Sequence, residues 1–143
     1  MTQAYDLYGV CIDKLREVAR ANGYALTSHG SLKRDIDLVA VPWTLNAVSA
    51  FVVAEEIRKA LEALYGLAVF NAKYAQPELK AYGRLAWSIV VGGWNSTYID
   101  LSVTGMIGAD FFLIRSVQLA NKYERLTKES SKVDEERKEP PCR

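Results

Sequence analysis

Apolar and polar positions recur with two different periods along this chain, and each period predicts one kind of element. Over residues 5–22 the apolar residues recur at steps of three and four, with charged residues opposite them. This spacing predicts an amphipathic helix, which can end at Gly23 because glycine adopts positive φ without steric cost. A second stripe of the same spacing predicts a helix that Thr44 caps and that ends at Gly66.

Four other segments have the β-branched or alternating pattern of strands, namely residues 24–29, 35–41, 85–91 and 97–103. Residues 92–96 read as a tight turn, so the last two strands are expected to pair antiparallel. Residues 67–74 are compatible with an edge strand, and Gln76-Pro77-Glu78 reads as a turn after it. This order predicts an α+β fold with a mixed, mostly antiparallel sheet covered by helices on one face. The other face is then free for a site.

After residue 108 the sequence changes from strand-like patterns to a helical pattern and then to a highly charged stretch. A last helix is expected to begin at Asp110, with Phe112, Leu119 and Tyr123 on one side. Residues 128–139 then carry four positive and five negative charges and almost no apolar side chain. We expect a single domain over residues 1–127 and a charged extension or tail over residues 128–143.

Composition narrows the class of protein. The chain has 143 residues, 50% of them apolar and 24% charged, which is typical of a folded domain that needs no disulfide or structural metal. A net charge of +1 argues against binding nucleic acid or anionic lipid through overall charge, so any charged site must be local. No apolar run is long enough to span a bilayer, and the first residues lack a signal-peptide pattern. We therefore expect a cytoplasmic protein with no membrane partner.

The candidate chemistry begins with two carboxylates on one expected strand. Side chains alternate along a strand, so Asp35 and Asp37 point to one face while Ile36 and Leu38 point to the other. Two adjacent negative charges repel each other and favour a cation between them. Carboxylate oxygens together with substrate phosphates are the ligands that Mg²⁺ prefers. The pattern therefore indicates a site for Mg²⁺ (or Mn²⁺).

A third carboxylate follows from the same alternation. Ile99 and Leu101 lie on the core side of the strand 97–103, which leaves Asp100 on the polar side. If this strand lies beside the strand 35–41, Asp100 can reach the metal that Asp35 and Asp37 share. We expect that adjacency.

Phosphate ligands are expected immediately before the acidic pair. Gly30 lets backbone amides approach an anion closely, and Ser31 adds a hydroxyl donor. Lys33 and Arg34 either neutralise further phosphate charge or pair with Asp35. His29, beside this step, is expected to be a hydrogen-bonded structural residue rather than a phosphate ligand.

The Gly30-Ser31 step, the Asp35-Ile36-Asp37 pair and the later Asp100 resemble the nucleotidyltransferase superfamily of the DNA polymerase β type. The resemblance covers roughly the first 105 residues. More loosely, the segments 29–35 and 98–103 resemble small nucleotidyltransferase-like proteins found in phage genomes. The family resemblance implies a nucleotidyltransferase-like fold in which Asp35, Asp37 and Asp100 are the catalytic and metal-binding residues for two Mg²⁺ ions.

The same resemblance implies that Gly30 and Ser31 bind the triphosphate of an NTP and that a hydroxyl acceptor receives the nucleoside monophosphate. Only Leu32, Lys33 and Arg34 separate the Gly-Ser step from the acidic pair, so the triphosphate cradle is short. The sequence does not identify the acceptor, with a partner protein or a nucleic acid among the candidates.

Two alternatives stay open at this point. One is a non-catalytic module that keeps the pocket to bind a nucleotide or second messenger. The other is an interaction protein that forms a homodimer, or docks a partner, through the apolar side of its last helix. The glycine fingerprints of P-loop and dinucleotide sites and the His and Cys spacings of zinc sites are absent from the sequence.

Overall fold

The computed structural model describes residues 3–71, 76–93, 97–105, 116, 119, 120 and 122–128. The chain divides into two compact units, residues 1–107 and 108–143, so the expected domain over residues 1–127 extends into both. The described residues of the second unit are helical, and the side chains of Leu119 and Tyr123 there are exposed. Asp110, Phe112 and the predicted tail beyond residue 128 lie outside the described residues.

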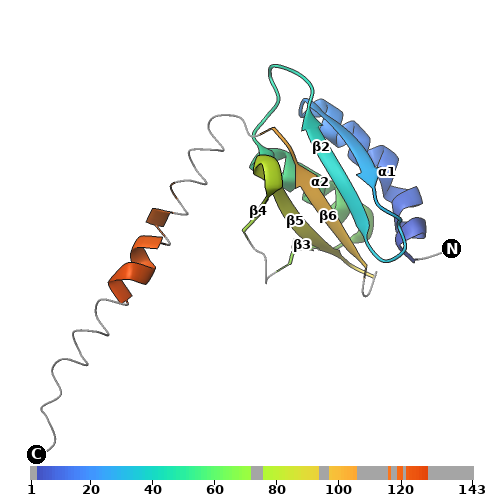
Figure 1. Cartoon of the computed structure of the whole chain (residues 1–143). Helices are drawn as coiled ribbons and strands as arrows, with labels where there is room; N and C mark the ends of the chain where they lie inside the picture. The colour runs from blue at the N-terminus through green and yellow to red at the C-terminus, as the bar shows by residue number, and fades with distance from the viewer. Residues whose placement is uncertain are drawn as a thin grey trace, which may run out of the picture. The chain divides into compact units, whose positions relative to one another are not determined.

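The described residues of the first unit form two long helices and six strands (Figure 1). In chain order they are α1 (Gln3–Ala21), β1 (Tyr24–His29), β2 (Ile36–Pro42), α2 (Ala50–Tyr65), β3 (Ala68–Phe70), β4 (Glu78–Lys80), the short turn η2 (Ala81–Gly83), β5 (Arg84–Val91) and β6 (Tyr98–Val103). The strand order is β1-β2-β6-β5-β3, and β4 also pairs with β5. β2 and β6 are parallel, whereas the other pairings are antiparallel. The predicted α+β class with a mixed, mostly antiparallel sheet is confirmed.

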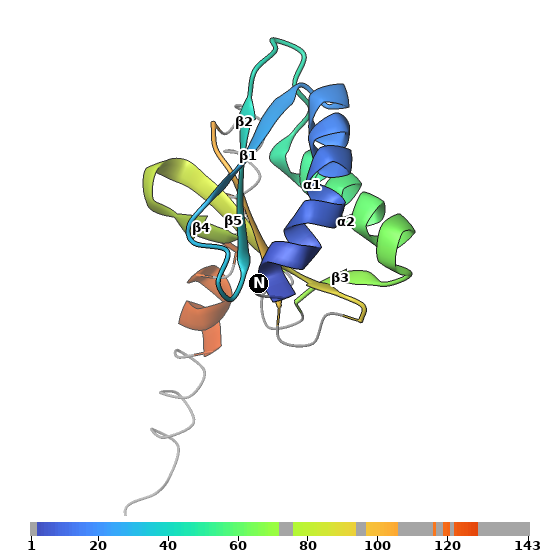
Figure 2. The ribbon, with the colours of Figure 1, turned by 90° about the vertical axis from the view of Figure 1, so that its right-hand side faces the viewer.

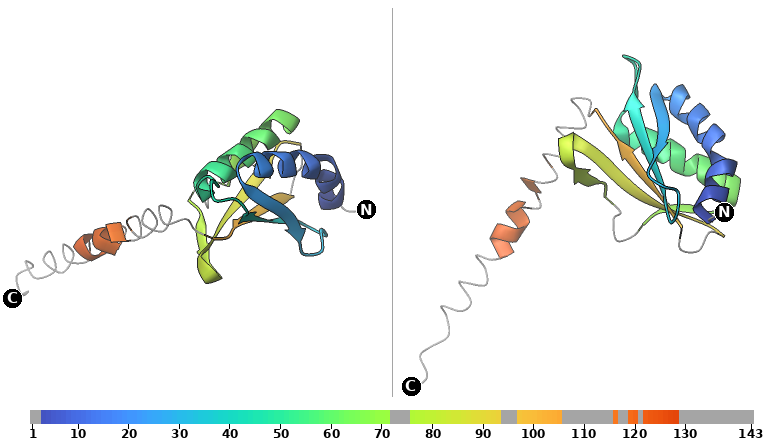
Figure 3. Two further views of the ribbon diagram at one scale, coloured as in Figure 1. Left: turned by 90° about the horizontal axis from the view of Figure 1, so that it is seen from above. Right: turned by 45° about the vertical axis from the view of Figure 1, so that its right-hand side comes forward.

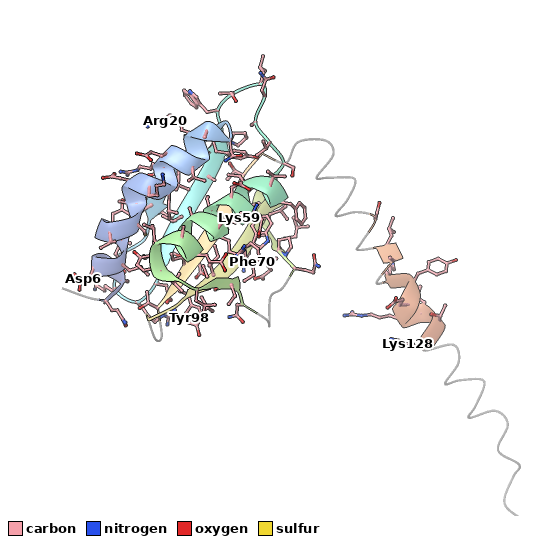
Figure 4. The ribbon with its side chains drawn as sticks, turned by 180° about the vertical axis from the view of Figure 1, so that it is seen from behind. Asp6, Arg20, Lys59, Phe70, Tyr98 and Lys128 are labelled. Carbon is pink, nitrogen blue, oxygen red and sulfur yellow. The ribbon has the colours of Figure 1, made fainter. Side chains whose placement is uncertain are left out.

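Both helices cover the same face of the sheet, as Figures 2 and 3 show from two directions. Figure 4, seen from the helix side, shows α1 and α2 next to each other, with Lys59 labelled on α2. No helix in the described part of the chain is both long enough and apolar enough to cross a membrane.

The core lies between the helices and the sheet because alternate strand residues point toward the helices. Ile36 and Leu38 of β2 and Ile99 and Leu101 of β6 are at most 1% exposed. Burying each such side chain stabilises the fold by roughly 1.5–3 kcal/mol before the entropy cost of ordering it. The residues between them in the sequence, Asp37 and Asp100 included, are therefore held on the opposite face of the sheet.

The start of α2 differs from the prediction. Thr44 does not cap the helix, which begins at Ala50 with Ser49 as its N-cap, where the Ser49 hydroxyl accepts from the Val52 amide at 3.3 Å. The loop before α2 is instead hydrogen-bonded to the residues that end α1, where the Trp43 amide donates to the Gly23 carbonyl at 2.8 Å. A Cβ on Gly23 would lie 2.5 Å from Thr44 Oγ1, so this close approach requires glycine. The predicted helix end at Gly66 is confirmed, with φ +76°.

Four of the strands lie within a residue of their predicted bounds, and the antiparallel pairing of β5 with β6 is confirmed. The expected edge strand is β3, which covers only Ala68–Phe70, while residues 72–75 lie outside the described part of the chain. The prediction of a turn through Glu78 is wrong, because Glu78 begins β4. A strand of three residues is too short to show an alternating pattern.

Candidate functional site

The pairing of the strands places a row of polar residues across the face that the helices leave free. His29 of β1 pairs with Asp37 of β2, Asp37 pairs with Asp100 of β6, and Asp100 pairs with Ser88 of β5. Neighbouring strands are about 4.8 Å apart, so directly paired residues are close neighbours. The predicted adjacency of the two acidic strands is confirmed, and it brings Asp37 and Asp100 side by side.

A cavity of about 440 Å³ lies over this row. Ligand pockets typically have volumes of about 300–1,000 Å³, so the cavity has room for a nucleotide-sized molecule. Its lining contains polar residues from several strands, among them His29, Asp37, Glu78, Lys80, Arg84, Ser88, Tyr98, Asp100 and Ser102.

The carboxyl group of Asp100 is in an environment that disfavours its negative charge. Burial raises the pKa of Asp100 most strongly, and the negative charges of Asp35 and Asp37 raise it further. A hydrogen bond with Ser88 and the positive charge of Lys80 act in the opposite direction. A cation bound between the carboxylates would relieve both the repulsion and the burial penalty. The electrostatics of the cavity therefore favour a positively charged ligand at Asp100.

Asp35 has partners of its own within the described structure. Arg34 Nε donates to Asp35 Oδ2 at 2.7 Å, and the backbone amide of Tyr98 donates to Asp35 Oδ1 at 3.4 Å. The hydrogen bond to Asp35 is the largest cause of the raised pKa of Arg34. Of the two roles open for Arg34, the structure shows the ion pair with Asp35. Lys33, in the same turn, is exposed.

Gly30 is placed directly against Asp37. It has a φ of +82°, and a Cβ at this position would lie 2.7 Å from Asp37 Oδ2. Any larger residue would therefore strain the backbone and crowd the carboxylate. Leu32 also has a positive φ, of 52°, so the chain turns tightly between β1 and β2. This turn brings Gly30 beside Asp37, with the exposed Ser31 next to it in the chain.

Two of the three predicted carboxylates, those of Asp37 and Asp100, lie side by side and fit a metal. Within the described residues, no group of three or more His, Cys, Asp or Glu side chains is arranged to hold a metal ion. Asp35, with its carboxylate bonded to Arg34, would join such a group only by exchanging that partner. Asp37 and Asp100 nevertheless meet the need of Mg²⁺, which is usually bound by one or two carboxylates plus substrate phosphates and water. The pair fits the metal, and Asp35 lies near enough to it that its charge raises the pKa of Asp100.

Sequence reasoning did not find Lys80, because it missed the strand that carries this residue. Lys80 and Arg84 are directly paired across β4 and β5, and both line the cavity with Asp100. The ring of Trp87, by contrast, lies on the helix side, where its centroid is 5.6 Å from that of Phe51. Trp87 is therefore a core residue. His29, which the sequence favoured as structural, lines the cavity and is exposed.

Comparison with known proteins does not identify a family. No family model matches the chain, and no curated protein and no solved structure matches it either.

Proposed function

We propose that this protein is a metal-dependent nucleotidyltransferase that moves a nucleoside monophosphate from an NTP to a hydroxyl acceptor. The proposal rests on one observation. Asp37 pairs with Asp100 on parallel neighbouring strands, and Gly30 lies directly against Asp37. The resemblance of the Gly-Ser step and the acidic residues to the polymerase β type of nucleotidyltransferase agrees with this arrangement.

Each part of the site has a distinct task in this proposal. Asp37 and Asp100 hold Mg²⁺ or Mn²⁺, and Asp35 joins them when the substrate phosphates draw Arg34 away from it. Gly30 and Ser31 bind the triphosphate, because a turn without a Cβ lets backbone amides approach an anion. Arg34 and Lys33 supply positive charge at the same turn. The cation, when bound, withdraws charge from the α-phosphate and favours ionisation of the acceptor hydroxyl.

The transfer is an in-line displacement in which atoms and charge balance. The acceptor oxygen forms a bond to the α-phosphorus, while the bond from this phosphorus to the bridging oxygen of the leaving pyrophosphate breaks. The hydroxyl proton passes to Asp100. Asp100 can accept this proton because its carboxylate lines the cavity in which the acceptor binds.

The test is the release of pyrophosphate from each of the common NTPs in the presence of Mg²⁺ or Mn²⁺, with candidate acceptors added. Asp37→Asn and Asp100→Asn are expected to lower turnover at least about 100-fold, because losing a metal ligand removes several kcal/mol of transition-state stabilisation. Asp13→Asn is the matched control, since Asp13 lies exposed on α1. Unchanged turnover in both site variants, with the fold intact, would contradict the proposal.

A nucleotide-binding module without turnover is the second candidate, and the ion pair between Arg34 and Asp35 favours it. A protein whose third carboxylate stays bonded to an arginine can bind a nucleotide while failing to complete a catalytic metal site. Calorimetry with a non-hydrolysable NTP analogue and Mg²⁺ separates the two functions. Binding that Asp37→Asn abolishes, together with no pyrophosphate from any NTP, would identify the module.

A further inference from the structure

Two cations meet on the face of the sheet that carries the carboxylates. Lys80 of β4 and Arg84 of β5 are directly paired, and both line the cavity. Like charges at directly paired positions of antiparallel strands destabilise a sheet. Their juxtaposition inside a cavity suits a negatively charged ligand that binds both.

The charge of this pair is only partly neutralised within the described structure. Lys80 Nζ lies 2.7 Å from Glu78 Oε2, and the charge of Lys80 also acts on Asp100. The side chains of the Glu78 pair are both partly exposed, and such pairs are weak. Arg84 Nη1 donates to the hydroxyl of Ser102 at 3.2 Å, and Arg84 forms no ion pair with any described residue. A guanidinium has five N–H donors in a planar fork, so Arg84 retains donors that match a phosphate.

The order of the strands places this cation pair on one particular side of the metal ligands. The Gly30 turn follows β1, Asp37 lies on β2, Asp100 on β6, and Arg84 and Lys80 lie on β5 and β4. In an in-line displacement the attacking and leaving oxygens lie on opposite sides of the phosphorus. A pyrophosphate leaving toward the Gly30 turn therefore requires an acceptor that enters from the side of β5 and β4.

An exposed aromatic residue lies between the two cations in the chain. Tyr82 is fully exposed and has a φ of +60°, an unusual backbone conformation for a residue with a side chain. Aromatic side chains next to cations bind nucleotides, since the base stacks on the ring while the cations bind the phosphate. Tyr82 does not itself line the cavity, so a ligand whose phosphate binds Lys80 and Arg84 would stack its base on this ring outside the cavity.

We infer that the acceptor is a nucleotide, whose phosphate binds Arg84 and Lys80, whose base stacks on Tyr82 and whose sugar hydroxyl is presented to Asp100. This inference rests on the proposed function for the direction of transfer. The nucleotide is either a free nucleoside monophosphate or the end of a short strand, because both offer the same phosphate, base and hydroxyl.

The experiment is calorimetry on the full chain with AMP, adenosine, inorganic phosphate and a 5′-phosphorylated trinucleotide, all in metal-free buffer. Arg84→Gln and Lys80→Gln are each expected to lower the affinity for AMP and for phosphate at least about tenfold, because each removes a charge-assisted contact. Tyr82→Ala is expected to lower the affinity for AMP about tenfold without changing phosphate binding. Tyr82→Phe is expected to bind AMP as the wild type does, because it keeps the aromatic ring. A trinucleotide that binds more tightly than AMP identifies a strand end, and equal or weaker binding identifies the free nucleotide.

Matched controls are Lys59→Gln, which removes an exposed cation of α2, and Trp43→Ala, which removes another exposed aromatic ring. Both are expected to bind AMP as the wild type does. Failure of the wild type to bind AMP, or equal AMP affinity in wild type and Arg84→Gln, overturns the inference.

A parallel titration with a non-hydrolysable ATP analogue and Mg²⁺ separates this inference from the proposed function. Arg84→Gln is expected to leave the analogue's affinity unchanged, and a selective loss of analogue binding would assign the cations to the NTP and overturn the inference. If Asp37→Asn leaves analogue binding unchanged, the proposed metal site fails instead. In that case the metal-free AMP titration still shows whether AMP binds at Lys80, Tyr82 and Arg84.

Discussion

At the level of a single residue, Gly30 contributes both to the turn after β1 and to the space around the carboxylate of Asp37. Its positive φ makes the tight turn after β1, and its missing Cβ leaves space for Asp37 Oδ2. Only the second of these properties is specific to the site, because other glycines of the chain also have positive φ. Gly93, for example, has a φ of +78°, and a Cβ there would meet no described atom within 4 Å.

Gly30→Ala is therefore expected to reduce the affinity for a Mg²⁺-bound NTP analogue at least about tenfold, because the new methyl group displaces a carboxylate that binds the metal. Gly93→Ala is the matched control, since alanine at either position costs about 1 kcal/mol of backbone strain. Both variants are expected to lose similar thermal stability, but only Gly30→Ala to lose calorimetric affinity. Equal affinities in the two variants would contradict this role of Gly30.

The raised pKa of Asp100 has a consequence for stability. The charged carboxylate is less favourable in the folded than in the unfolded state, so its penalty is absent below the unfolded pKa and fully present above the folded one. Asp100→Asn is therefore expected to stabilise the metal-free protein at pH 7 by roughly 0.5 kcal/mol, because it removes a half-buried charge together with its repulsion by Asp35 and Asp37.

Urea unfolding at neutral pH and at about pH 3 measures this effect, because an ordinary aspartate is mostly protonated at the lower value. The stability advantage of Asp100→Asn is expected to shrink as the pH falls. An advantage that stays constant, or a variant that is less stable at neutral pH, would show that the carboxylate is not penalised.

At the scale of the element, the start of α2 shows how tertiary contacts select between two possible caps. Thr44 and Ser49 both precede the apolar stripe, and both residue types are good N-caps. Backbone hydrogen bonds between the loop and the end of α1, including Val48 N to Asn22 O at 3.1 Å, hold the chain out of the helix until Ser49.

Ser49→Ala is expected to destabilise the protein by about 1 kcal/mol, because the Val52 amide loses its acceptor. Thr44→Ala is expected to cost less than about 0.5 kcal/mol, the usual size for an exposed position. Urea midpoints of the two variants give the comparison. A larger loss in Thr44→Ala would restore Thr44 as the residue that stabilises the helix start.

The elements were predictable wherever a period extends over many residues. The helices and the four longer strands each show their pattern in the sequence itself, and alternation alone placed Asp37 and Asp100 on the free face. β4 was not predictable, because its residues Glu78–Lys80 are too few for a period. The cation pair of Lys80 with Arg84 was missed for the same reason.

The candidate site was predictable only in part. The adjacency of β2 and β6 was expected because it lets Asp100 reach the metal site of the other two acids, and the register confirms it. The partner of Asp35 was left open, since a sequence does not show which of two cationic roles Arg34 takes. The structure shows their hydrogen bond at 2.7 Å. This contact decides whether two or three carboxylates are available to a metal.

At the scale of the whole molecule, the first unit contains all the described strands, both long helices and every residue assigned to the site. A fragment of residues 1–107 is therefore expected to unfold cooperatively and to bind the NTP analogue with Mg²⁺ as the full chain does. Urea unfolding and calorimetry check both properties. Loss of cooperative unfolding would show that the first unit depends on residues 108–143.

The central claim is that Asp37 and Asp100 share a divalent cation which also binds the phosphates of a nucleotide. Crystals of the full chain with a non-hydrolysable NTP analogue and Mn²⁺ test it directly, because Mn²⁺ is located by its anomalous scattering. The account predicts a manganese peak within about 2.5 Å of an oxygen of each carboxylate, with the triphosphate at Gly30 and Ser31. A nucleotide bound elsewhere, or bound here with no manganese at this pair, would contradict it.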